Sequence, residues 1–103
     1  MAYVEFTAIG YSEEYQNFAL CGRELAIRLS QLFKSRVQEL DSGYAVSFDG
    51  HGMLLGKDIK PNRWFMRVEP SPFISDKVIQ CSIRTIVEIL STDNSISDIV
   101  VGD

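Results

Sequence analysis

The residue types that most often carry out chemistry are few in this sequence, and none has a partner at a recognisable spacing. His51 is the only histidine, and it lies in the segment Asp-Gly-His-Gly at residues 49–52. A metal site usually needs three or four ligands with characteristic spacing, and a histidine base acts on a nucleophile held beside it. Neither Cys21 nor Cys81 is close to His51 in the sequence. We therefore interpret His51 as a solvated turn residue and predict no metal site.

Two further patterns do not complete a chemical motif. Gly56-Lys57 follows the glycines around His51, but no Ser or Thr comes next and no predicted helix follows to bind a phosphate at its N-terminus. Cys21 has no histidine or basic cluster nearby that would activate its thiol as a nucleophile. The acidic residues are scattered, and spacing alone pairs none of them. We predict a protein that is not an enzyme and has no cofactor.

The longest regular pattern in the chain is helical. Apolar residues between positions 15 and 40 recur three or four residues apart, which at about 100° per residue places them on one stripe. Ser12 is a suitable N-cap, and Gly43 follows the last apolar residue, Leu40, where glycine commonly ends a helix. The pattern predicts one long helix over residues 11–40. Gly22 lies on its apolar side and marks either a close backbone contact or a bend.

The rest of the chain has the patterns of short strands and one more helix. Alternating residues predict strands at 2–9, 44–48, 53–55, 63–69 and 96–101, and a broad apolar stripe predicts a helix at 76–91. This order is typical of an α+β, ferredoxin-like two-layer sandwich. We expect a mainly antiparallel sheet of four or five strands, covered on one face by two helices. Whether residues 53–55 form a separate strand decides between the two numbers.

The composition indicates one globular domain spanning residues 1–103, with 46% hydrophobic and 23% charged residues. Fourteen acidic residues against ten basic ones give a net charge of −4. This balance disfavours nucleic-acid binding and suits a basic protein partner, although ordinary solubility is the simpler explanation. No export signal precedes the first strand, and no segment has the roughly 18 apolar residues of a membrane span. We expect a cytoplasmic protein with reduced cysteines.

One face of the predicted sheet is a candidate partner-binding surface. If Trp64, Met66 and Val68 face the helices, alternate residues of the same strand face away from them, next to outward residues of the first strand. The candidate residues are Tyr3, Glu5, Arg63, Phe65 and Arg67. Aromatic residues and arginines are enriched at the centres of protein interfaces. The competing interpretation is a surface ladder of cross-strand pairs, such as Arg67 with Glu5.

A second candidate patch lies on the predicted long helix. Leu20 and Ile27 are seven residues apart and project to the side opposite the main apolar stripe. Two aligned apolar residues suggest a small covered patch. The second helix, the chain termini or another molecule would cover it, and the last alternative predicts a homodimer through the long helix.

Three functions from different classes agree with these patterns. The first is a non-catalytic protein-binding domain: a small acidic inhibitor, of the type of bacterial immunity proteins and antitoxins, that neutralises a basic, nuclease-like toxin. The second is a dimeric ferredoxin-like domain that binds a small ligand, or acts as an enzyme, between sheet and helices. The third is RNA binding through the open sheet face, whose strand lacks the glycine and second outward aromatic of RNA-recognition domains. We expect the first, with a protein as partner and neither nucleic acid nor membrane.

Overall fold

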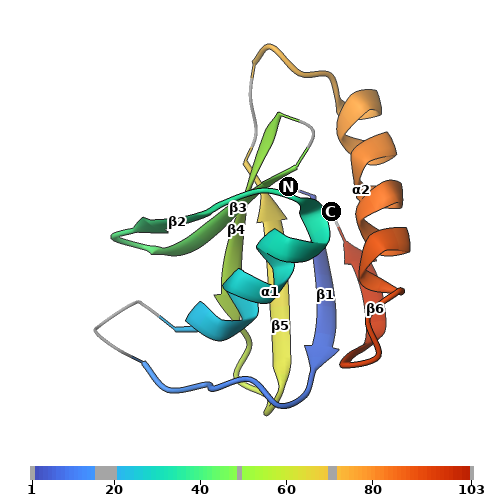
Figure 1. Cartoon of the computed structure of the whole chain (residues 1–103). Helices are drawn as coiled ribbons and strands as arrows, with labels where there is room; N and C mark the ends of the chain where they lie inside the picture. Colours follow the sequence, from blue (N-terminus) through green and yellow to red (C-terminus); the bar gives the residue numbers. More distant parts are fainter. Residues whose placement is uncertain (1, 16–20, 49, 70–71, 103) are drawn as a thin grey trace.

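The computed structural model describes residues 2–15, 21–48, 50–69 and 72–102, and these form six strands and two helices. Figure 1 shows the helices α1 and α2 beside a twisted sheet. In chain order the elements are β1 (Tyr3–Ala8), α1 (Arg23–Phe33), β2 (Val37–Leu40), β3 (Gly43–Phe48), β4 (His51–Lys57), β5 (Arg63–Val68), α2 (Asp76–Leu90) and β6 (Ile96–Gly102).

All six strands belong to one antiparallel sheet, in the order β2-β3-β4-β5-β1-β6. The prediction of an α+β fold with two helices on a mainly antiparallel sheet is confirmed. The predicted number of strands is wrong, because the sheet has six strands and not four or five. The segment 53–55 belongs to β4, a full strand of seven residues. The additional strand is β2, which sequence periodicity assigned to a helix.

The core lies between the helices and one face of the sheet. In β1 and β5 every second residue is buried, as the alternation predicted: Val4, Phe6 and Ala8 in β1, and Trp64, Met66 and Val68 in β5. These residues form one buried cluster with Leu25 and Leu29 of α1 and with Ile83 and Ile86 of α2. Both helices therefore cover the same face, and the strands' other residues point away from them.

The predicted helix over residues 11–40 is wrong at both ends. Residues 11–15 are not helical, residues 16–20 lie outside the described residues, and α1 begins only at Arg23. At its other end Lys34 adopts a left-handed conformation, with φ 55°, and the amide of Ser35 donates to the carbonyl of Ser30. Glycine usually occupies this position after a helix, so a lysine there gives no stop signal in the sequence. Residues 37–40 then pair with β3 as strand β2.

Gly22 is a close backbone contact and not a bend. It precedes the helix with φ +91°, and a Cβ atom there would lie 2.5 Å from Cζ3 of the buried Trp64. The chain thus enters α1 directly over the Trp64 ring.

Neither of the two helices in the described part of the chain is long and apolar enough to cross a membrane.

Candidate protein-binding surfaces

The residues predicted to bind a partner do come together on the helix-free face of the sheet. Strands β1 and β5 pair so that Tyr3 lies opposite Arg67, Glu5 opposite Phe65, and Thr7 opposite Arg63. We call this surface the open face and define it by Tyr3, Glu5, Arg63, Phe65 and Arg67. Each of these residues is partly exposed, and in the described part of the chain no helix packs on this side.

Two aromatic rings of the open face lie on glycines of neighbouring strands. Phe65 is paired with Gly56 of β4, and Tyr3 is paired with Gly102 of β6. A Cβ atom at either glycine would collide with the ring opposite it. Cross-strand packing of an aromatic on a glycine covers exposed backbone and restrains the ring. Phe65 and Tyr3 are therefore held close to the sheet, with one side of each ring turned to the backbone.

Arg63 is the fixed cation of the open face. Its guanidinium donates to Glu5 Oε2 at 2.9 Å, to Thr7 Oγ1 at 3.0 Å and to the carbonyl of Asp98 at 2.7 Å. Only 13% of its side chain is exposed. The predicted cross-strand ladder thus exists, but the pair of Arg67 with Glu5 is wrong. Glu5 bonds Arg63 because that guanidinium is directed toward β1 by two further acceptors.

Arg67 differs from Arg63 in that its guanidinium makes no hydrogen bond or ion pair with the residues that the structure describes. It lies between Leu54 of β4 and Tyr3 of β1 in the strand register. A partly exposed arginine beside apolar neighbours retains its five donors for another molecule. On the open face, a guanidinium without a partner among the described residues therefore lies two positions along β5 from the partly exposed ring of Phe65.

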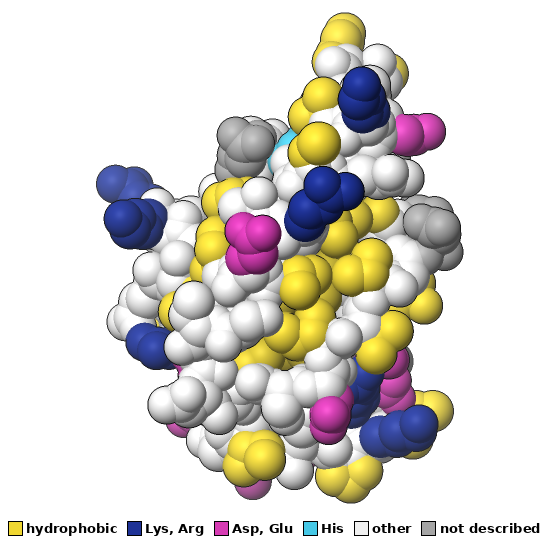
Figure 2. Space-filling model, turned by 90° about the vertical axis from the view of Figure 1, so that its right-hand side faces the viewer, with side chains coloured by type: hydrophobic (Ala, Val, Ile, Leu, Met, Phe, Trp, Pro, Cys, Tyr) yellow, Lys and Arg dark blue, Asp and Glu magenta, His cyan; other side chains and the backbone are white. Residues whose placement is uncertain are grey.

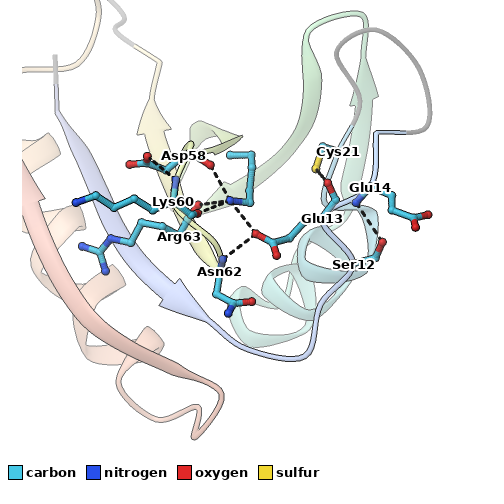
Figure 3. A network of polar contacts seen from close by, with 9 residues as sticks. Ser12, Glu13, Glu14, Cys21, Asp58, Lys60, Asn62 and Arg63 are labelled. Carbon is cyan, nitrogen blue, oxygen red and sulfur yellow. Dashed lines mark hydrogen bonds and ion pairs between the residues drawn. The ribbon is translucent and has the colours of Figure 1, made fainter.

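A network of hydrogen bonds and one ion pair connects Glu13 to the turn between β4 and β5. Figure 3 shows Glu13 directed toward the turn between β4 and β5, where the amide of Asn62 donates to Glu13 Oε1 at 2.7 Å. The ammonium of Lys57 lies 2.8 Å from the same oxygen and also donates to the carbonyls of Asp58, Lys60 and Arg63. The bond from Lys57 is the main reason why the pKa of Glu13 is lowered.

Two further contacts at this end of the sheet involve Lys57 and Cys21. Lys57 Nζ also lies 5.4 Å from the centroid of the Trp64 ring, a cation–π contact. The Cys21 thiol donates to the carbonyl of Glu13, and burial raises the pKa of this thiol. A raised pKa means that less of this thiol is thiolate at neutral pH.

His51 is buried, so its predicted role as a solvated turn residue is wrong. It is 2% exposed, and its Nε2 lies 2.9 Å from Ser82 Oγ on α2. The turn between β3 and β4 is short enough that β4 begins at His51 itself, opposite Phe48. His51 therefore shares the inward face of β4 with Met53 and Leu55. Because His51, Met53 and Leu55 occupy alternate positions, this spacing could have predicted that His51 is buried with the other two.

The contact between His51 and Ser82 joins β4 to α2 but lacks the other parts of a catalytic site. Among the described residues, none bonds the second ring nitrogen, Nδ1, so no carboxylate orients the imidazole. Ser82 lies in the middle of α2, where backbone amides are already bonded within the helix and cannot form an oxyanion hole. Within the described ranges, no group of three or more His, Cys, Asp or Glu side chains could hold a metal ion.

An apolar groove on the α2 side of the molecule was not predicted. It measures about 1000 Å³ and lies between one flank of α2 and the ends of β1, β5 and β6. Figure 2 shows hydrophobic side chains gathered in this hollow, with charged side chains around it. The apolar residues are Ala2, Val68, Ile79, Ile83, Val87 and Val101, and the charged ones are Asp76, Arg84 and Glu88. We call this hollow the α2–β6 groove.

The second predicted patch was placed on one long helix, which the described part of the chain does not contain. Leu20 lies outside the described residues, and Ile27 is exposed on α1, beside Arg23 and Glu24. The prediction required both residues on one helix, but α1 begins after Leu20. The long helix over residues 11–40 is therefore wrong, while the homodimer itself stays a prediction.

Comparison of the chain with protein-family models, with curated proteins and with solved structures finds no match.

Proposed function

We propose that this chain is a non-catalytic protein-binding domain that contacts its partner through the open face. The observation that carries the proposal is the arrangement of Phe65 and Arg67: a ring fixed on a glycine, next to a guanidinium without a described partner. Aromatic residues and arginines supply most binding hot spots, and side chains already held in place lose less entropy when they bind. Arg63 is likewise held in place, by its hydrogen bonds to Glu5 and Thr7.

The net charge of −4 supports a basic protein as the partner. Opposite net charges accelerate the encounter of two proteins, and the effect falls as salt is added. The close contacts at the open face then decide affinity, with Arg67 meeting an acceptor on the partner. This combination suits a small inhibitor of a basic, nuclease-like toxin, in the manner of an immunity protein or antitoxin.

We also propose that a ferredoxin-like plait underlies the sheet. Strands β4, β5, β1 and β6 lie side by side in that order, and the helices α1 and α2 occur in the connections that such a plait requires. In this view β2 and β3 are a hairpin added to the plait. The addition leaves the open face on β1 and β5 unchanged.

The proposal predicts that the double change Phe65→Ala with Arg67→Ala abolishes capture of the partner. Tagged protein would be used to capture binding proteins from the cells that produce it, at low and at high salt. Loss of two hot-spot side chains should weaken binding by at least about 100-fold. The wild-type protein should retain a basic protein, and retain less of it as salt increases.

The matched control is Ile59→Ala with Arg23→Ala. Like the test variant, it removes one apolar side chain and one arginine, so the net charge changes by the same amount in both variants. Ile59 and Arg23 are both exposed and lie outside the open face. This control should capture the same partner as wild type. Equal capture by the Phe65/Arg67 variant, verified as folded by circular dichroism, would show that the open face is not the binding surface. Capture of RNA in place of a protein would contradict the proposed function itself.

A further inference from the structure

Half of one edge strand of the sheet lacks the features that normally prevent edge strands from pairing. β6 is the outer strand next to β1, and in the described part of the chain nothing pairs with its free side. Its first half is interrupted at Asp98, where φ is +50° and the register with β1 shifts. Its second half, Ile99 to Gly102, has no charge and no proline. Charged residues, prolines and bulges are the usual protection of edges, so this half remains open to pairing.

The two valines of this half-strand expose apolar surface on both sides of the sheet. Val100 is 50% exposed and Val101 is 52% exposed. Val101 also lines the α2–β6 groove, so the edge and the groove form one continuous apolar surface. The other edge of the sheet differs, because β2 contains the exposed Gln38 and Glu39.

Two of the three charged residues on the rim of the groove, Arg84 and Glu88, match a copy of the same surface, and the third, Asp76, lies about two turns away at the start of α2. Arg84 and Glu88 are both exposed and lie one helical turn apart on the groove side of α2. In a twofold contact the same patch of both copies meets itself. If the twofold axis lies level with the midpoint between Arg84 and Glu88, each arginine comes to lie beside the glutamate of the other copy. Charges of one sign at these two positions would repel their copies, whereas Arg84 and Glu88 attract theirs.

We propose that two copies of this chain associate through the side formed by β6 and α2. The two β6 edges run antiparallel, so the six-stranded sheet continues into the second copy. A twofold axis perpendicular to the sheet keeps both helix layers on the same side, and each α2 then closes the groove of the other copy. The contact is centred on β6 and α2, and β1 separates β6 from Phe65 and Arg67 on β5, so the contact does not depend on the proposed function.

Light scattering coupled to size-exclusion chromatography tests the association. The wild-type protein should have a mass near twice 11.6 kDa at high concentration and dissociate on dilution. Val101→Lys should raise the dissociation constant by at least about 100-fold, because it places a charge in the apolar centre of the contact. Val101 is half-exposed, so this variant should stay folded. Ile59→Lys makes the same change at a fully exposed residue and should leave the dimer unchanged.

A charge exchange on α2 tests the twofold arrangement. Arg84→Glu alone should weaken the dimer, because glutamates would then face glutamates. Adding Glu88→Arg should restore it, since each arginine again meets a glutamate of the other copy. A wild-type chain that stays monomeric up to about 1 mM would overturn the proposal. So would a dimer that survives Val101→Lys, or a native mass spectrum showing a small ligand bound to a monomer.

Discussion

Replacing Gly22 with alanine is expected to lower the free energy of unfolding by about 3 kcal/mol. The new Cβ would lie 2.5 Å from Trp64 Cζ3 and 3.0 Å from Cη2, and Trp64 is fully buried and cannot move aside. Overpacking of this kind costs about 1–3 kcal/mol, and a left-handed conformation costs an alanine about 1–2 kcal/mol more. Urea denaturation followed by tryptophan fluorescence would measure the loss.

Two further variants separate the collision from the backbone strain. Gly10 has nearly the same φ, +93°, but a Cβ there would meet nothing within 4 Å. Gly10→Ala should therefore cost only about 1 kcal/mol, the strain alone. In a Trp64→Phe background, where the outer ring atoms are absent, Gly22→Ala should cost less than in the wild type. Trp64 is the only tryptophan, so unfolding in this background is followed by circular dichroism. Equal costs for Gly22→Ala and Gly10→Ala would contradict the close contact.

Replacing Asp93 with alanine is expected to lower the free energy of unfolding by a similar amount, about 3 kcal/mol. The buried carboxylate accepts bonds from the amide and the hydroxyl of Ser95, at 2.8 and 2.6 Å, and from Arg28 on α1 at 2.7 Å. Each hydrogen bond contributes about 1 kcal/mol, and the bond to the partly exposed Arg28 contributes no more than that. Asp41 is exposed, so Asp41→Ala is the control that should change stability little.

The same site predicts a dependence of stability on pH. The pKa of Asp93 is lowered from 3.8, chiefly by the bond from the Ser95 hydroxyl, with Arg28 contributing. A carboxyl whose pKa is lower in the folded state stabilises the protein fully above the unfolded value and loses this effect as pH falls through the folded value. The wild type should therefore lose stability below about pH 4, and Asp93→Asn should lose less over the same range. Identical pH profiles for the two proteins would contradict this role for Asp93.

The sequence was sufficient for the parts of the fold in which local pattern and tertiary structure agree. The alternation in β1 and β5 correctly separated the inward face of Trp64 from the outward face of Phe65. The open face followed from this separation and from the pairing of the two strands. The hydrogen bonds within the open face could not be predicted in this way. Which arginine bonds Glu5 depends on the position of the Asp98 carbonyl in β6.

The errors arose where tertiary contacts decide the conformation. Val37 and Leu40 have helical spacing, but they belong to a strand because Lys34 ends α1 in the left-handed conformation. Residues 11–15 resemble a helix start, but Glu13 is held by Lys57 and Asn62, both far away in the sequence. The α2–β6 groove is a gap between elements, and its shape depends on how α2 lies on the sheet. No periodicity in a single chain reports that position.

The most direct test of binding through the open face is a cross-saturation NMR experiment on the complex of this chain with its captured partner. Saturation of the partner should transfer to the side chains of Tyr3, Phe65 and Arg67, which lie together on β1 and β5. It should not transfer to Ile79 and Ile83, which line the groove. Transfer confined to α1, or to the groove, with no loss of signal at Phe65, would contradict the account.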